Sequence, residues 1–439
     1  MTARLRKFID DLGQSFWLLP AAMVLVGIAL AIGLVEVDRT NLAPQWLLEN
    51  GWSYSGSATG ARSILTAIVS STIGVAGTAF TITIAALSLA AGQMGPRLLH
   101  NFTRDRGVQF TLGIFLAAFA YSLMVLRTVR TPDEGGFVPH LALLVAILLA
   151  FGCVATLIYF VGHMAGRINV DTVVELVGED VHVGIRSLTV DEAGPEPPPL
   201  ETWKDAVAIC DDRRGYLSQL DGNGLADWAA EQGIAIRLLV RPGHYVFPGA
   251  PIAVATVAKE GIETAVRNAT ALGDQRVTSA DLEFAVRQLV EVAVRALSPG
   301  VNDPLTAISV LDRLATALCD LVRLHLPSGV YTRDDRAVLV VPTVDYGGLT
   351  NTMFDMIRQY AAACPAVLIR MIEVLTAVAS CEKAPARIAT LQRHADLILQ
   401  QAEGANLLPS DLQDVRDRHA TFVAMCKSGP AAALNPTDT

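Results

Sequence analysis

The sequence predicts an α-helical membrane domain with four transmembrane helices, followed by a soluble α+β region in which a small β-sandwich or barrel-like segment precedes a helical bundle. Two observations lead to this prediction. Four long apolar segments end before residue 166, and the longest uncharged run, Ser63 to Pro96, holds 34 residues. As a helix, such a run extends roughly 50 Å, which exceeds the ~30 Å hydrocarbon core of a bilayer. The rest of the chain is richer in charge and is typical of a soluble fold.

The four apolar segments contain no Asp, Glu, Lys or Arg, and each is long enough to cross a bilayer. Only helices and closed barrels satisfy their backbone polar groups in lipid. Uninterrupted apolar runs exclude the alternating pattern of a membrane β-barrel. The predicted spans are Phe16–Val35, Ile64–Ala91, Val108–Leu126 and Leu141–Gly162.

Basic residues predict the orientation, because cytoplasmic loops of membrane proteins carry an excess of Lys and Arg. The segment before the first span, the loop between the second and third spans, and the segment after the fourth contain Arg4, Arg6, Lys7, Arg97, Arg104, Arg106 and Arg167. The other two loops hold two arginines each. We therefore expect both termini to lie in the cytoplasm.

The soluble region divides by composition. We expect a membrane domain at 1–166, a linker with a small strand-rich subdomain at 167–260, and a mainly helical subdomain at 261–439. The sequence GPEPPP at 194–199 predicts a stiff, extended linker. Net charge is −9 for the whole chain, and the excess of acidic residues lies after residue 166. An acidic soluble region argues against nucleic-acid binding, which requires a basic face.

Short apolar segments between turn residues predict strands. Turns at Pro242-Gly243 and Pro248-Gly249 flank a short apolar piece, a pattern similar to the barrel-sandwich fold of biotinyl and lipoyl domains. Residues 215–258 contain no Lys to carry such a cofactor, so a structural β-sandwich is preferred over a swinging-arm domain, and no cofactor is expected. The predicted strands are Ala206–Cys210, Gly215–Leu220, Ile234–Val240, Tyr245–Val257 and Arg336–Val341, with a short helix at Leu225–Gln232.

Helical periodicity covers most of the remainder. Ser279 or Thr278 is expected to cap a helix that runs to about Leu297, and Asp303 followed by Pro304 is a typical helix start. The further predicted helices are Leu349–Ala363, Ala366–Ala379, Pro385–Gln401 and Ser410–Ala424.

The second span carries a stripe of small and hydroxyl-bearing residues, spaced by three or four positions on one helix face. Its members are Ser63, Thr66, Ser70, Gly74, Gly77, Thr81 and Ser88. Such residues permit close helix packing and hydrogen bonds between helices. A packing face is one interpretation, and the lining of a polar pathway at the axis of an oligomer is the other. The span has no charged residue at mid-depth, so a pump or proton relay is not supported.

Glycine and proline cluster where the second span ends. Gly92, Gly95 and Pro96 predict a bend, and Arg97 follows at the level of the lipid phosphates. The segment is either an interfacial anchor or a hinge or gate beneath the span.

A loop between two predicted helices forms the third candidate site. Ser298, Asn302 and Asp303 lie in this loop, and Arg287 and Arg295 precede it on the first helix. A helix N-terminus beside guanidinium groups can hold an anion or an acidic metabolite. Against this, Asp303 already supplies a negative cap, so a structural corner is the alternative interpretation.

Motifs for catalysis or metal binding are missing from the sequence. It has no HExxH, GxSxG, Walker or GxGxxG motif, no CxxC pair, and its eight His residues lack ligand spacing. The six Cys residues all fall in a span or in the expected cytoplasmic part, as in a reducing compartment. We expect no catalytic residues, no metal site and no enzymatic activity.

Three sequence blocks resemble a bacterial family of membrane proteins known as domain of unknown function 2254. They are Ala85–Leu99, Arg241–Ala253 (RPGHYVFPGAPIA) and Phe284–Ile308, which contains FAVRQLVEVAVRALSPGVNDPLTAI. The resemblance covers nearly the whole chain. It implies a bacterial inner-membrane location and the same layout of spans and cytoplasmic domain, and it brings no established activity.

Together these features predict a homo-oligomeric channel or pore-like conduit for small ions in the lipid bilayer, regulated by its cytoplasmic domain. The alternative is a non-conducting, membrane-anchored scaffold or sensor. An enzyme that acts on a membrane lipid is a third hypothesis, which lipid turnover by the purified protein would support.

Overall fold

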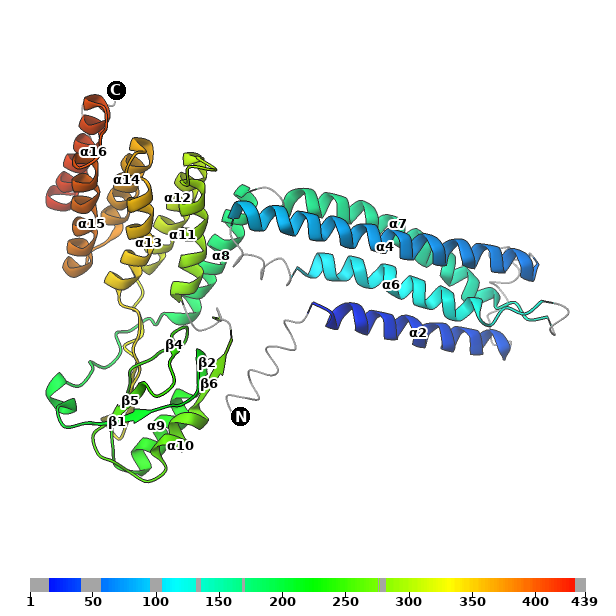
Figure 1. Ribbon diagram of the computed structural model, residues 1–439, viewed down its shortest axis with the longest axis horizontal. Coiled ribbons are helices and arrows are strands. Elements are labelled where there is room, and N and C mark those ends of the chain that lie inside the picture. The colour runs from blue at the N-terminus through cyan, green and yellow to red at the C-terminus, as the bar shows by residue number, and fades with distance from the viewer. Residues whose placement is uncertain are drawn as a thin grey trace. The chain divides into compact units, whose positions relative to one another are not determined.

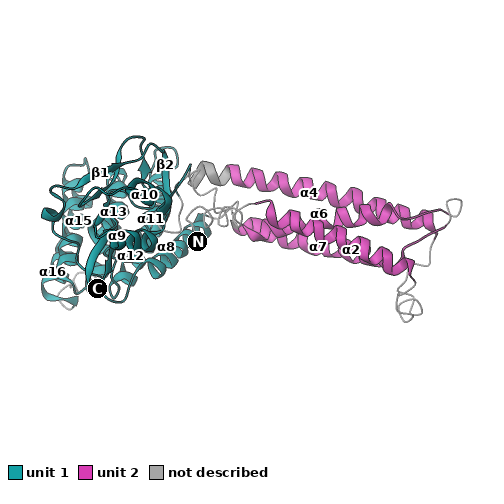
Figure 2. Ribbon diagram, turned by 90° about the horizontal axis from the view of Figure 1, so that it is seen from below, with its two compact units in different colours: residues 1–10, 93–95, 170–439 teal, residues 11–92, 96–169 magenta. Residues whose placement is uncertain are grey.

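The computed structural model describes residues 16–40, 57–94, 105–131, 136–167, 170–274, 276 and 282–430. The chain divides into two compact units, which Figure 2 shows in different colours. One comprises residues 11–92 and 96–169, and the other comprises mainly residues 170–439. We describe each unit by itself.

The first unit consists of four long helices, all apolar and long enough to cross a membrane (Figure 1). The four predicted spans are therefore confirmed as bilayer-length helices, and the second extends further at both ends than its sequence pattern indicated. The helices are α2 (Leu18–Arg39), α4 (Ala58–Met94), α6 (Arg106–Leu126) and α7 (His140–Arg167).

Helix α6 is the most buried of the four and packs against both α2 and α7. The crossing with α2 is close because glycine leaves room for it. A Cβ atom added at Gly27 would lie 2.8 Å from the carbonyl oxygen of Ala117, and one added at Gly113 would collide with the Met23 sulfur. Among the described residues, the backbone of α4 approaches its three neighbours less closely than they approach one another.

Polar groups join the helices at one end of this bundle. The carboxylate of Asp38, at the end of α2, accepts hydrogen bonds from the backbone N–H groups of Leu141 (3.0 Å) and Ala142 (2.9 Å). These are two of the N–H groups that the first turn of a helix leaves without intrahelical partners. The hydroxyl of Tyr121 donates to the Ala142 carbonyl at 2.8 Å. Asp38 therefore caps α7 from a different helix.

The second unit contains two sheets. A five-stranded sheet has the order β1-β5-β3-β8-β7, in which only the β3–β8 pair is parallel, and a three-stranded antiparallel sheet has the order β4-β2-β6. The strands are β1 (Val207–Cys210), β2 (Gly215–Leu220), β3 (Ile236–Leu238), β4 (Tyr245–Val246), β5 (Pro251–Ala255), β6 (Thr270–Gly273), β7 (Val330–Arg333) and β8 (Arg336–Val340). This is the mixed helical and small-sheet region expected, and its closure into a sandwich or barrel stays a prediction.

Two features of the sheets differ from the sequence pattern. The segment Tyr245–Val257 forms two strands in different sheets, because the chain turns at Gly249, whose φ of +76° suits glycine. Strands β6 and β7 have no counterpart among the predicted strands, whereas β8 was predicted as Arg336–Val341. The short helices α9 (Gly222–Glu231) and α10 (Ile262–Ala269) share an apolar core with these strands.

Helices make up the rest of the second unit. They are α8 (Val170–Leu188), the 3₁₀ turn η3 (Leu200–Trp203), α11 (Leu282–Ala296), α12 (Pro304–Leu321), α13 (Tyr346–Tyr360), α14 (Pro365–Cys381), α15 (Pro385–Glu403) and α16 (Pro409–Ser428). Asp303 caps α12 with Pro304 at its first position, as predicted. The expected caps Thr278 and Ser279 lie outside the described residues.

Candidate functional site

The small-residue stripe of α4 faces away from the other helices of its own chain. All seven members, Ser63, Thr66, Ser70, Gly74, Gly77, Thr81 and Ser88, are exposed. The opposite face is buried and consists of Ala58, Ala61, Leu65, Ile68, Thr72, Ala76, Ala79 and Ala86. The chain therefore packs α4 through alanine and leaves the glycine and hydroxyl positions open.

The stripe has open space at its glycine positions and exposed isoleucines on the same helix. A Cβ atom added at Gly74 or Gly77 would meet nothing within 4 Å. Ile73, Ile82 and Ile84 are exposed on either side. The spacing Ser70-x₃-Gly74 and Gly77-x₃-Thr81 is the small-x₃-small pattern that lets membrane helices approach closely.

Stripe hydroxyls donate to carbonyls of their own helix. Ser63 donates to the Thr59 carbonyl at 3.0 Å, and Thr81 donates to the Gly77 carbonyl at 2.9 Å. Their hydrogen-bonding capacity is thus partly met, and their oxygens retain acceptor capacity on the open face. The face can pack against another helix or contact water.

A small hollow lies inside the bundle, between α4, α6 and α7. Its volume is about 10 Å³, close to the least that one water molecule requires. Its lining comprises Phe16, Ala79, Phe80, Thr83, Val108, Thr111, Leu112 and Phe160. A hollow of this size offers no route for ions through the interior of one protomer.

Of the predicted hinge or gate residues, Gly92 lies within α4, which continues as helix to Met94. Gly95, Pro96 and Arg97 lie outside the described residues. The hinge therefore stays a prediction.

The structure brings Ser298, Asn302 and Asp303 together in a tight corner. The Ser298 hydroxyl donates to the Arg295 carbonyl at 2.6 Å, and Asn302 adopts a φ of +51°. Asp303 accepts from the Thr306 hydroxyl and backbone N–H at 2.6 and 3.2 Å. These bonds, the hydroxyl bond first, hold the pKa of Asp303 below its usual range despite partial burial.

The two arginines of the same prediction lie along α11. Arg295 pairs with Glu291 at 3.7 Å, whereas Arg287 pairs with Glu283 at 3.5 Å. Arg287 and Ser298 are eleven residues apart, or about 16 Å along the chain direction at helical rise. Arg287 thus pairs with Glu283 and does not belong to the corner formed by Ser298, Asn302 and Asp303.

A buried Asp–His pair was not predicted from the sequence. Asp105 is the N-cap of α6 and accepts from the Gly107 N–H at 2.7 Å, and its carboxylate contacts Nε2 of His163 on α7 at 2.8 Å. Tyr159 stacks on the His163 ring, with centroids 5.4 Å apart. A Cβ atom at position 107 would lie 2.7 Å from His163 Nε2, so glycine makes room for the pair. An Asp before an apolar helix predicts a helix cap. Its pairing with His163 could not be predicted from local sequence, because the two residues are 58 positions apart.

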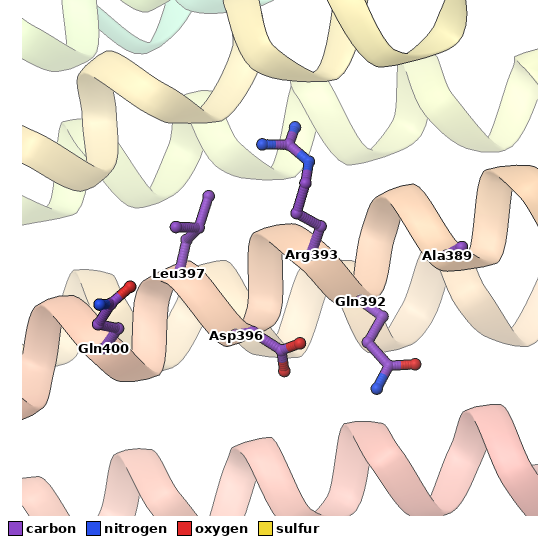
Figure 3. Close-up of a pocket in the computed structure, with 6 residues that line it drawn as sticks. All are labelled: Ala389, Gln392, Arg393, Asp396, Leu397 and Gln400. Atoms are coloured by element: carbon purple, nitrogen blue, oxygen red, sulfur yellow. The ribbon is translucent and has the colours of Figure 1, made fainter.

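A hollow of about 360 Å³ lies on α15 in the second unit. All six lining residues, Ala389, Gln392, Arg393, Asp396, Leu397 and Gln400, come from that one helix (Figure 3). A surface lined by a single helix cannot enclose a substrate. Within the described ranges, no group of His, Cys, Asp and Glu could hold a metal ion.

Four bilayer-length apolar helices joined to an α+β unit define a polytopic α-helical membrane protein. The chain belongs to the family DUF2254, described as predicted membrane proteins, whose model matches residues 13–377. The resemblance seen in three sequence blocks is thereby confirmed.

Its relatives include uncharacterized proteins of Mycobacterium tuberculosis (strain CDC 1551 / Oshkosh) and Mycobacterium bovis (strain ATCC BAA-935 / AF2122/97). Each is 30% identical over 425 residues, which cover 92% of this chain and 79% of the relative. No solved structure matches the chain.

Proposed function

We propose that this protein forms homo-oligomeric channels for small ions in the bacterial inner membrane, with α4 of each protomer facing the central axis. Both termini then lie in the cytoplasm, and the unit that begins at residue 170 regulates conduction. The proposal includes no catalytic activity, no cofactor and no nucleic-acid partner.

The observation that carries the proposal is the outward direction of the α4 stripe. Glycine costs about 1 kcal/mol relative to alanine inside a helix. None of the described residues makes a contact that offsets this cost at Gly74 or Gly77, where the space is open. A neighbouring protomer would offset it by close packing, since small residues favour such contacts between membrane helices.

The small size of the hollow inside the bundle supports a route between protomers rather than through one. The hollow of about 10 Å³ among α4, α6 and α7 is too small for a hydrated ion. On the outer side of α4, exposed hydroxyls follow one another from Ser63 to Ser88. Hydroxyl oxygens along an axis can replace part of the hydration shell of an ion.

Ion flux from proteoliposomes that contain the purified full-length protein tests the proposal. We expect wild-type vesicles to release K⁺ or Cl⁻ faster than empty vesicles. Ser70→Leu and Thr81→Leu should reduce this flux by at least about tenfold, because each fills the stripe with an apolar side chain.

Val154→Leu is the matched control, since it adds volume at an exposed position of α7. It should leave flux unchanged. Wild-type vesicles that remain as tight as empty ones over a range of pH and voltage would contradict conduction.

A non-conducting scaffold or sensor is the second candidate. The observation that favours it is that Ser63 and Thr81 already bond to their own helix, which allows the stripe to pack dry against another helix. A stable oligomer without flux would support this function.

A further inference from the structure

We infer that Arg241, Arg276 and Arg287 form a binding site for a phosphate-bearing anion in the second unit. The inference does not depend on conduction, and it concerns a place where three separate chain segments converge on Glu283.

Glu283 lies in the first turn of α11 and is only 8% exposed. Its carboxylate faces three guanidinium groups. Arg241, from the loop between β3 and β4, approaches to 3.0 Å, Arg287 to 3.5 Å and Arg276, which follows β6, to 3.8 Å. Three guanidinium groups of the described residues therefore converge on this one carboxylate.

The pairing is uneven. Charge-assisted hydrogen bonds between guanidinium and carboxylate groups are about 2.7–2.9 Å long. Only the contact of Arg241 approaches this length, and the contacts of Arg276 and Arg287 are longer. The Glu283 carboxylate thus leaves Arg287 without a short charge-assisted bond, and like charges held near one another repel in a partly desolvated place.

One donor at this cluster is left unused. The Nε atom of Arg287 is buried and has no hydrogen-bond partner among the described residues. A buried donor without a partner is unfavourable, because it has lost its hydrogen bonds to water. The Nε of Arg241, in contrast, donates to Nε2 of His244 at 3.1 Å. An anion that contacts Arg287 would accept a hydrogen bond from this Nε atom, which no described residue accepts.

The cluster is also accessible. The Arg287 side chain is 42% exposed, against 16% for Arg241, so a solute can approach from the Arg287 side. The Arg276 guanidinium stacks over the Phe284 ring at 5.9 Å, which restricts its direction. Two fixed arginines and one open arginine can form the fork-shaped contacts that phosphate oxygens accept.

The ligand chemistry is that of a phosphate group, carried by a soluble metabolite or by a lipid headgroup. Tyr245 and Phe247, on the chain segment that follows Arg241, are exposed and lie with their rings 5.0 Å apart. Exposed aromatic rings suit a nucleobase as well as a lipid interface. The test therefore treats the two sources separately.

The alternative is a structural hub, in which Glu283 ties the strand region to α11 by ion pairs. Glu283→Gln separates the two accounts. It frees three guanidinium groups, so an anion site should bind phosphate several-fold more tightly, whereas a purely structural hub would only lose stability.

The experiment is titration calorimetry of the full-length protein in detergent with inorganic phosphate, at constant ionic strength. Arg241→Gln and Arg287→Gln should each weaken binding by at least about tenfold, equivalent to about 1.4 kcal/mol. Arg370→Gln is the matched control, because Arg370 is similarly exposed and pairs with Glu373 on its own helix, α14, outside both candidate anion sites. It should leave phosphate affinity unchanged.

The lipid arm uses native mass spectrometry of the same proteins with short-chain phosphatidic acid and, for comparison, an uncharged diacylglycerol. Retention of phosphatidic acid that is lost in Arg287→Gln identifies a headgroup as a ligand, and phosphate binding without such retention identifies a soluble one. No binding of either probe to wild type would overturn the inference. Equal loss in Arg287→Gln and Arg370→Gln, or no gain in a folded Glu283→Gln protein, would overturn it as well.

Discussion

Two glycine-bearing helix surfaces in the membrane unit have opposite surroundings. Gly27 of α2 lies against the backbone of α6, where an added Cβ would be 2.8 Å from the Ala117 carbonyl oxygen. Gly74 and Gly77 of α4 face open space. At Gly27, the absence of a side chain allows close contact between α2 and α6. The second surface also carries glycine but has no partner among the described residues, and this difference leads to the proposal that a neighbouring protomer supplies one.

The largest effect on the folded protomer is expected from Gly27→Leu. The new side chain would overlap the α6 backbone, and overpacking of this kind costs about 1–3 kcal/mol or more. Thermal unfolding in detergent should therefore begin at a clearly lower temperature than in wild type. An unchanged transition would mean that the α2–α6 crossing can widen without cost.

A second prediction concerns pH and the second unit. His394 is 1% exposed, and burial, followed by the nearby Arg393 and Arg358, lowers its pKa to about 4. Because the unfolded chain binds the proton more readily, stability is full above the ordinary pKa of about 6.5 and decreases as pH falls toward 4, by about 3 kcal/mol in total.

Unfolding of wild type and His394→Gln at pH 7 and pH 4.5 measures this contribution. The variant should lose less stability between the two pH values than wild type does. Equal losses in both proteins would show that His394 does not contribute to acid sensitivity.

The third prediction concerns the cap shared between helices. Asp105→Ala removes the acceptor for the Gly107 N–H and for His163, and loss of a helix N-cap costs about 1–2 kcal/mol. Asp105→Asn keeps a capping oxygen and should restore part of the loss. Chemical denaturation in detergent compares the three proteins, and equal stability of Asp105→Ala and wild type would contradict this role.

The smallest effect on the protomer, and the sharpest contrast with Gly27, is expected from Gly74→Leu. Open space surrounds Gly74, so protomer stability should change by less than about 1 kcal/mol and can rise through the better helix propensity of leucine. The oligomer should dissociate, which light scattering of the detergent-solubilised protein detects. If Gly74→Leu destabilised the protomer as much as Gly27→Leu does, the proposed difference between the two glycine surfaces would be wrong.

The sequence was sufficient for features that depend on local pattern. Uncharged length predicted the four membrane helices, and the Asp303-Pro304 start predicted α12. The spacing of small and hydroxyl residues also predicted the stripe on α4. It did not predict that the stripe faces away from the other helices of the chain.

Long-range pairings were beyond the sequence. Strand β8 pairs with β3, which precedes it by about a hundred residues, and no local signal joins them. The contact of Arg241 with Glu283 arises in the same way, from segments that meet only after folding. Sequence reasoning placed Arg287 and Arg295 in one candidate site because they share a helix. In the structure they pair with different carboxylates, Glu283 and Glu291.

Cysteine cross-linking in the membrane tests most directly whether copies of α4 meet. In a chain whose six native cysteines are replaced by alanine, Gly77→Cys should form disulfide-linked dimers on mild oxidation. Ile158→Cys, at a 73% exposed position of α7, should remain monomeric. Efficient cross-linking through position 158, together with none through position 77, would contradict the account.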